Sequence, residues 1–246
     1  MSFWHPLYEV PARLTEEWGH HRIFAPESYP AIRAVDTVPI TFSEGGSLAR
    51  HVPLCWRRDD DRLRLVALLG LRPDCRRVLP YEELPLAIRG YPFVVPNNDT
   101  ISRREIWVDR AIADKPTDMG APLVLDDGKL SKAAQMRAQN VLQLAYEAAA
   151  TEALGDELTE AGLLEPWPLE FDLGGGKKFR RSDLFVLSAA RLSDPAFFGL
   201  IERHGASAGL LLGYHRASLF RINWLLADAR AAASRAALPE GRGDVR

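Results

Sequence analysis

The sequence predicts an α+β fold with a mixed, mainly antiparallel β-sheet, one long central helix and two C-terminal helices packed on it. Short runs of aliphatic and aromatic residues, separated by turn formers, follow one another over residues 38–109. Apolar residues then recur at helical spacing over residues 129–154, and two further helical stretches follow residue 194. Because no long linker interrupts the chain, we expect one domain over residues 1–246.

The first 35 residues predict an irregular N-terminal arm. Prolines stand at positions 6, 11, 26 and 30, and no apolar periodicity is sustained between them. Each proline removes a backbone donor and biases the residue before it toward extended geometry, which disfavours a helix.

Six strands are predicted between residues 37 and 109. Three consecutive aspartates at 59–61 separate the second run from the third and indicate a hairpin. Residues 84–89 have the length of one or two helical turns. The predicted strands cover residues 38–42, 52–57, 63–69, 76–79, 91–95 and 105–109.

The clearest predicted helix covers residues 129–154. Ser131 can cap its first turn, because a serine hydroxyl accepts a hydrogen bond from an exposed backbone amide. The apolar positions repeat at helical spacing, so one face is expected to pack on the sheet. They are Met136, Val141, Leu142, Leu144, Ala145 and Ala148. We expect Gly155 to end this helix and residues 156–161 to form a shorter one that ends at Gly162.

A hairpin is predicted for residues 169–173 and 178–187. The three glycines at 174–176 join the two runs, and glycine adopts positive φ without a steric penalty.

Two helices and a frayed tail are predicted after the hairpin. Asp194 and Pro195 begin the first helix in the favoured order of cap and proline, and Gly205 ends it. The second covers residues 207–233, and the tail is residues 238–246. We expect the last helix to lie across the sheet beside the long helix, because its leucines share one broad face.

The charge balance excludes whole classes of partner. The chain has 31 basic and 33 acidic residues and a net charge of −2, so no global positive field attracts nucleic acid or an anionic membrane. No apolar stretch approaches the roughly 20 residues that a membrane span needs, and the first residues lack the pattern of a secretory signal. We therefore expect a cytoplasmic protein without a membrane span or a nucleic-acid partner.

No motif predicts a metal or a cofactor. The six histidines never form the close pairs that are typical of metal ligands. The glycines at 174–176 and the lysines that follow lack the spacing of a phosphate-binding loop, and no nucleophile elbow is present. Cys55 and Cys75, the only cysteines, are predicted to be reduced thiols.

His215 is the one weak candidate for a catalytic residue. On a helix, its neighbours three and four residues away are mostly leucines, which favours a core histidine bonded to one carbonyl. The alternative is a general base facing a pocket, because histidine exchanges a proton most readily near neutral pH. The spacing of residues around it supplies no partner for this second role.

Arginine and aromatic side chains suggest a site for an acidic or peptide ligand. Guanidinium groups bind carboxylates through paired hydrogen bonds, and aromatic rings offer flat contact area. The alternative is a solvated sheet face with aromatic anchors in the core. The candidate ligand-binding residues are Arg72, Arg89, Tyr91, Trp107, Tyr214 and His215.

Five segments, in order along the chain, resemble the SapC family of bacterial proteins. They are VALLGLRP (66–73), IRGYPFVV (88–95), GAPLVLDDGKLS (120–131), GLLEPWPLEF (162–171) and AGLLLGYHRASL (208–219). Two positions depart from the family pattern: Asp74 replaces a glycine, and Gly90 replaces an arginine. Both changes lie near the candidate arginines.

The resemblance implies an accessory protein with a protein or peptide partner. The family is named for a component linked with bacterial surface layers, and other members look like companions of secretion or peptide- and metabolite-tailoring systems. We therefore expect a non-catalytic binding or accessory protein. The alternative is an enzyme that acts on a peptide or small acidic metabolite, alongside a flavin halogenase or an iron/2-oxoglutarate oxygenase, with His215 and the arginines as its candidate residues.

Overall fold

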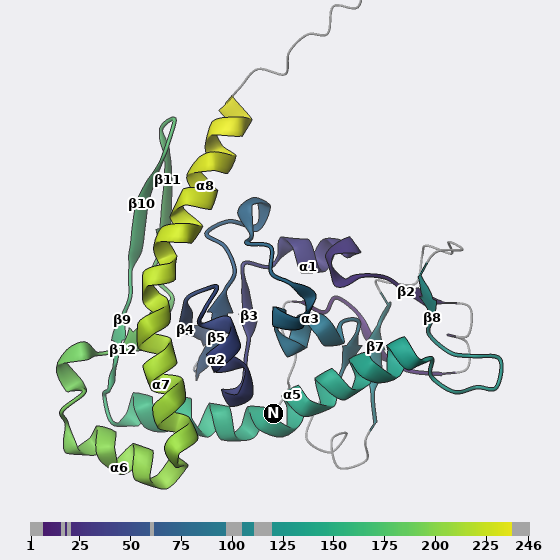
Figure 1. The fold of residues 1–246 in the computed structure, drawn as a ribbon, viewed down its shortest axis with the longest axis horizontal. Coiled ribbons are helices and arrows are strands. Elements are labelled where there is room, and N and C mark those ends of the chain that lie inside the picture. Colours follow the sequence, from purple (N-terminus) through teal and green to yellow (C-terminus); the bar gives the residue numbers. More distant parts are fainter. Residues whose placement is uncertain are drawn as a thin grey trace, which may run out of the picture.

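Antiparallel sheets, a long helix and a set of C-terminal helices build the fold, which confirms the predicted α+β class (Figure 1). The computed structural model describes residues 7–15, 18, 21–59, 62–96, 105–110 and 120–237. The predicted tail, residues 238–246, lies outside the described residues.

The central sheet has five strands in the order β3-β5-β4-β12-β9, and every neighbouring pair is antiparallel. Its strands are β3 (Thr37–Pro39), β4 (Leu54–Asp59), β5 (Arg62–Leu68), β9 (Leu164–Pro166) and β12 (Leu184–Leu187). The pairing of β4 with β5 confirms the hairpin predicted from the three aspartates. A late segment of the chain, β12, pairs with β4 and so joins the early strands to the C-terminal part.

Three smaller sheets have the strand orders β1-β7-β6, β2-β8 and β10-β11. Their strands are β1 (Pro11–Arg13), β2 (Arg22–Ile23), β6 (Phe93–Val94), β7 (Trp107–Asp109), β8 (Ala121–Pro122), β10 (Leu169–Gly174) and β11 (Lys177–Arg181). In the described part of the predicted arm, Leu7, Ile23 and Ile32 are buried in the main core.

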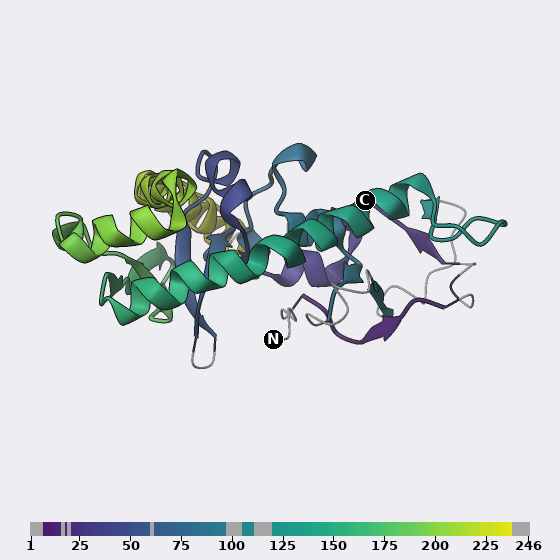
Figure 2. The ribbon, with the colours of Figure 1, turned by 90° about the horizontal axis from the view of Figure 1, so that it is seen from below.

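Helices cover the sheets and connect them. The α-helices are α1 (Pro30–Ala34), α2 (Gly45–Leu48), α3 (Leu86–Gly90), α5 (Lys132–Glu160), α6 (Pro195–His204), α7 (Ala206–Ser218) and α8 (Ile222–Ala237). Short 3-10 turns are η2 (Pro26–Ser28), η3 (Phe42–Glu44), η4 (Pro73–Cys75), η5 (Tyr81–Glu83), η7 (Ala189–Arg191) and η8 (Leu219–Arg221). Figure 2 shows α5 running across most of the molecule.

The long helix has the predicted cap, but it begins at Lys132 rather than at residue 129 and does not end at Gly155. Ser131 caps it by accepting a hydrogen bond from the amide of Ala134. The helix then continues through Gly155 to Glu160, and Gly162 follows with a φ of 62°. A Cβ on Gly155 would lie 3.0 Å from the carbonyl oxygen of Leu63 and 3.5 Å from the Trp56 ring, so this glycine allows the helix to approach the sheet.

The two faces of the central sheet carry separate cores. Leu54 and Trp56 of β4 face one core, which also contains side chains of α5 and α7. Cys55 faces the other core, which α8 and the β10–β11 hairpin cover. The helix predicted over residues 207–233 is thus divided by η8: α7 shares a core with α5, whereas α8 packs on the opposite face.

Two predicted strands differ from the structure. Residues 76–79 form no strand, and the Arg76 guanidinium binds Glu27 and the carbonyl of Ile32. The return strand predicted over residues 178–187 is two strands: β11 stays in the hairpin, and β12 joins the central sheet. The three turn glycines have positive φ, as predicted.

Enlarging Gly155 tests the close approach of α5 to the sheet. We expect Gly155→Val to lower the free energy of unfolding by about 1–3 kcal/mol, because the added carbons overlap the backbone of Leu63. The matched control is Gly213→Val, since a Cβ on Gly213 meets nothing within 4 Å and should change stability by less than about 0.5 kcal/mol. Urea unfolding measures both; equal effects would contradict this packing.

Candidate functional site

His215 occupies a fork between two strands of the central sheet. The pairing of β4 with β12 stops at Phe185 opposite Trp56. Beyond that pair the His215 ring is inserted: its Nδ1 lies 2.7 Å from the carbonyl oxygen of Leu54, and the amide of Leu187 donates to its Nε2 at 3.0 Å. The imidazole therefore replaces a backbone hydrogen bond of the ladder.

Neighbouring side chains of α7 satisfy the other backbone groups at the fork. The amide of Leu54 donates to Ser218 Oγ at 2.8 Å, and this hydroxyl donates in turn to the His215 carbonyl at 2.7 Å. Arg216 donates to the carbonyl of Leu187 at 2.9 Å. Three residues of one helical turn thus bind both backbone groups of Leu54 and of Leu187, which anchors α7 to the sheet.

The fork requires a neutral His215 with its proton on Nδ1. Because Leu187 donates to Nε2, that nitrogen must accept, and only Nδ1 can donate to Leu54. Desolvation by burial lowers the pKa of His215 to about 3, and the ring packs edge-on against Trp56. The predicted burial of His215 is confirmed, and both ring nitrogens are engaged by backbone rather than open to a substrate.

The six candidate ligand-binding residues do not form one site in the structure. Arg72 precedes η4 and pairs with Asp74. Trp107 lies in β7 and donates to Glu105. Tyr214 of α7 is partly exposed, and its ring lies beside Gly46 of α2.

Arg89 lies in the last turn of α3, and Tyr91 follows this helix directly. Tyr91 is buried, donates to Asp109 at 3.3 Å and packs against the rings of Tyr8 and Tyr29. Burial and the negative charge of Asp109 raise its pKa. The Nε of Arg89 is buried without a hydrogen-bond partner, and the positive charge of Arg89 acts on Glu44.

A buried carboxyl group, Glu44, is the titratable site that sequence reasoning missed. It accepts from the amides of Thr41 and Leu86 at 2.9 Å and 2.6 Å, so it joins η3 to the start of α3. Desolvation by burial raises its pKa to about 7. The sequence signal was available, because Thr41 and Glu44 have the spacing of a capping box.

Thr41 links Glu44 to a second carboxylate. Its hydroxyl lies 3.1 Å from Glu44 Oε2 and 2.7 Å from Glu147 Oε2, and Ser43 also donates to Glu147. One hydroxyl proton cannot serve both carboxylates. A protonated Glu44 resolves this, because it can donate to Thr41 while Thr41 donates to Glu147.

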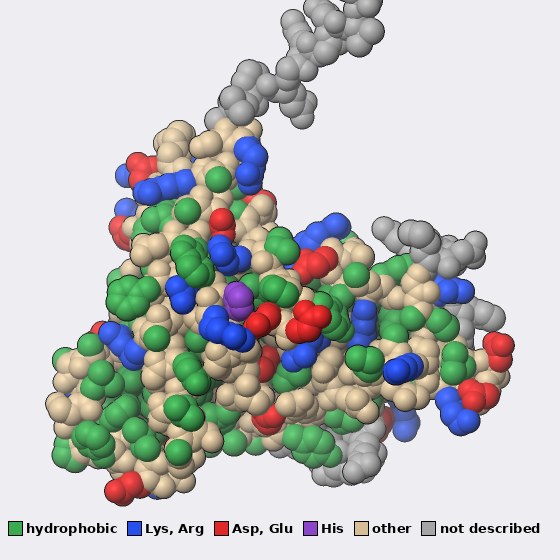
Figure 3. All heavy atoms as spheres, in the orientation of Figure 1, with side chains coloured by type: hydrophobic (Ala, Val, Ile, Leu, Met, Phe, Trp, Pro, Cys, Tyr) green, Lys and Arg blue, Asp and Glu red, His purple; other side chains and the backbone are tan. Residues whose placement is uncertain are grey.

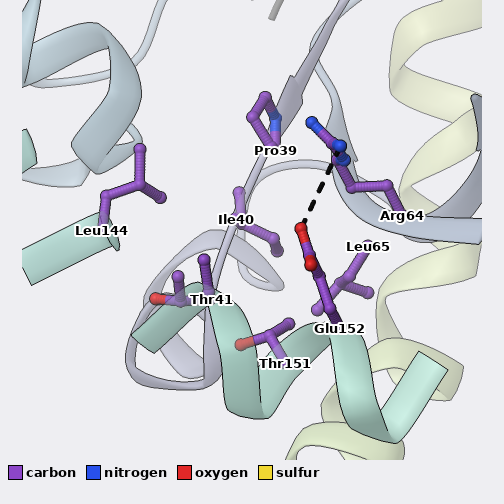
Figure 4. Close-up of a pocket in the computed structure, with 9 residues that line it drawn as sticks. Pro39, Ile40, Thr41, Arg64, Leu65, Leu144, Thr151 and Glu152 are labelled. Atoms are coloured by element: carbon purple, nitrogen blue, oxygen red, sulfur yellow. Dashed lines mark ion pairs between the residues drawn. The ribbon is translucent and has the colours of Figure 1, made fainter. Parts of the chain in front are cut away.

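A small groove lies beside this cluster (Figure 4). It has a volume of about 40 Å³ and is lined by apolar residues of β3, β5 and α5 together with Thr41 and Thr151. Arg64 and Glu152 form an ion pair of 4.0 Å at its rim. This volume accommodates ordered water rather than a peptide or metabolite.

A line of uncharged positions runs along the exposed side of α7, η8 and α8. Eight exposed positions alternate in steps of three and four residues, which is the spacing of a helix seam that packs on another helix. We call these residues the outer seam: Leu210, Gly213, Ala217, Phe220, Trp224, Ala227, Ala231 and Ser234. Leu210 is 59% exposed and Phe220 is 77% exposed. Figure 3 shows apolar side chains along the column that α7 and α8 form, with basic side chains beside them.

Comparison with known proteins identifies the family. The model of the SapC family matches residues 15–201, which is most of the chain. The chain belongs to the SapC family. Neither the curated proteins nor the solved structures include a match to it.

The matched residues of this SapC-family chain end within α6. The fork residues of α7 and the outer seam therefore lie beyond the matched residues, as does the fifth segment of the predicted resemblance. In the described part of the chain, no helix combines the length and apolar character of a membrane span, and no group of three acidic, histidine or cysteine side chains is arranged around a metal position.

Replacing His215 tests the fork. We expect His215→Leu to lower the free energy of unfolding by about 2–5 kcal/mol, because it leaves a buried amide and a buried carbonyl without partners. His215→Gln keeps a donor and an acceptor and should recover part of this loss. Since the pKa of His215 is lowered in the native state, its contribution is present above pH 6.5 and is lost as the pH falls toward 3. Wild type and His215→Gln should therefore become closer in stability across this window; a constant difference would contradict the assignment.

The contribution of Glu44 to stability changes with pH in the opposite direction to that of His215. Its pKa is raised in the native state, so its contribution to stability is present below pH 4.5 and is lost as the pH rises through about 7. We expect the stability of wild type relative to Glu44→Gln to fall between pH 5 and pH 8, by at most about 1.4 kcal/mol per pH unit. Urea unfolding across this range measures it, and a pH-independent difference would contradict the raised pKa.

Proposed function

We propose that this SapC-family chain is a non-catalytic accessory protein that binds a partner protein through the outer seam of α7 and α8. In keeping with the family resemblance, the partner belongs to a bacterial surface-layer, secretion or peptide- and metabolite-modification system. The proposal places the protein in the cytoplasm, as one domain without a cofactor.

The observation that carries this proposal is the outer seam itself. A solvated helix face normally carries charged residues, whereas all eight seam positions lack charge over 25 residues. Phe220 and Trp224 bring large rings to this surface, and aromatic residues are the side chains that contribute most to protein interfaces.

The anchoring of α7 supports the same conclusion. His215, Arg216 and Ser218 bind the ends of β4 and β12 from the inner side of α7. On the next helix, Leu225 and Ala229 are buried in the second core. The outer seam is thus held in place before a partner arrives, which lowers the entropy lost on binding.

The alternative, an enzyme acting on a peptide or small acidic metabolite, has less support from the geometry. Its candidate base, His215, is buried with both nitrogens bonded to backbone. Its candidate arginines, Arg72 and Arg89, lie on different elements, and Arg72 is paired with Asp74.

Reconstitution with a native partner tests the proposal. A partner that co-purifies with the tagged protein from its host is identified, and the pair is reconstituted from purified components. We expect Trp224→Ala to weaken binding by about 2 kcal/mol, or about thirtyfold, and Phe220→Glu to abolish it. Circular dichroism should show that both variants keep their helices. The melting temperature of Phe220→Glu should stay unchanged, because the Phe220 side chain is 77% exposed.

The matched control lies on another helix. Tyr146 of α5 is 57% exposed, and Tyr146→Glu introduces the same charge outside the outer seam. This variant should bind the partner like wild type. Equal binding by wild type, Phe220→Glu and Trp224→Ala would overturn the proposal, as would loss of binding in Tyr146→Glu alone.

A further inference from the structure

Basic side chains flank the outer seam on both sides. Arg221, Arg230 and Arg235 stand next to seam positions along η8 and α8, and Asp228 is the only acidic residue between positions 206 and 237. Asp228 is already paired, because Arg77 contacts it at 3.1 Å. The whole chain has a net charge of −2, so this positive flank is a local feature.

We infer that the partner presents an amphipathic helix with an apolar seam and acidic residues on both of its flanks. This inference rests on the proposed function, since it specifies the chemistry of the partner at the same surface. Complementary charges beside a helix seam select the partner and its orientation, and like charges reject the wrong one.

The shape of the outer seam fits a helix. Three seam positions carry large side chains, Leu210, Phe220 and Trp224, and the other five are small. The small positions leave holes for side chains of a facing helix. The guanidinium groups of Arg77 and Arg221 lie 4.7 Å and 4.2 Å from the centre of the Trp224 ring. These contacts hold a flat anchor at the middle of the seam. Because Arg77 is paired with Asp228, Arg221 is the one of the two that adds a positive charge at the edge of the seam.

Charge also argues against a second copy of the same chain. In either orientation, a facing copy brings arginines of one flank against arginines of the other. A hollow of about 340 Å³ adjoins the seam at Ala231, and its lining includes Asp74 and Asp228. These carboxylates do not change this, because Asp74 pairs with Arg72 and Asp228 with Arg77. An acidic helix supplies the missing countercharges.

Synthetic helices provide the probe. Two labelled peptides of about four heptads carry the same Leu and Ala seam, with Glu at every flanking position in one and Lys in the other. Fluorescence anisotropy with the full chain measures their affinities. We expect the Glu peptide to bind at least about tenfold more tightly than the Lys peptide, and to weaken several-fold when NaCl rises from about 50 to about 500 mM.

Reversing the charge of two flanking arginines tests whether they determine the preference for the Glu peptide. Arg221→Glu combined with Arg235→Glu should reverse the preference toward the Lys peptide. Arg13→Glu combined with Arg33→Glu makes the same change in net charge on β1 and α1, and it should keep the preference for the Glu peptide. Amide chemical shifts should move along the outer seam, and Phe220→Glu should remove the binding of both peptides.

The outcomes separate this inference from the proposed function. Equal affinity for both peptides, or a preference that charge reversal leaves unchanged, overturns the acidic partner while seam-dependent docking stands. Failure of both peptides to bind overturns the helical partner, and reconstitution with the native partner still decides the proposed function. Concentration-dependent dimerisation that Phe220→Glu abolishes, or binding to anionic vesicles without peptide binding, would also contradict the inference.

Discussion

The architecture depends on the insertion of His215 between β4 and β12. Two adjacent strands normally satisfy their own backbone groups, but here they separate after the pair of Trp56 and Phe185. The neutral imidazole has one donor and one acceptor in the positions that the separated carbonyl and amide need. A charged ring or an apolar side chain cannot meet both needs. The fork therefore couples the C-terminal helices to the early strands of the sheet.

The attachment of α7 to the sheet determines which side chains of α7 and α8 face solvent. Every hydrogen-bonding side chain of the fork turn points to the sheet, and the same rotation of the helix turns Leu210 and Ala217 to solvent. Past η8, α8 packs its buried residues against the second core and continues the uncharged face. The outcome is a long, uncharged surface edged with arginine, and this surface is the basis of the proposed binding role.

Local signals in the sequence predicted the local parts of the fold. Ser131, the Asp194–Pro195 pair and Gly205 marked helix ends correctly, since capping depends on a few neighbouring residues. The sequence predicts a helix end at Gly155, but this glycine serves a tertiary contact with β5 that spacing does not reveal. The sequence also predicts that residues 184–187 belong to the hairpin, because their partner strand β4 lies more than 120 residues away in the chain. Among the site residues, the burial of His215 followed from helical spacing, whereas Glu44 and the outer seam were missed. The helix has apolar residues on two faces, and spacing alone does not tell which face is buried.

Hydroxyl-radical footprinting of the protein, free and bound to its native partner, tests the central claim most directly, because it reports the solvent contact of individual rings. The account predicts that Phe220 and Trp224 are oxidised readily in the free protein and several times more slowly in the complex, while Tyr146 on α5 reacts equally in both. Equal oxidation of Phe220 and Trp224 in the free protein and the complex would contradict it.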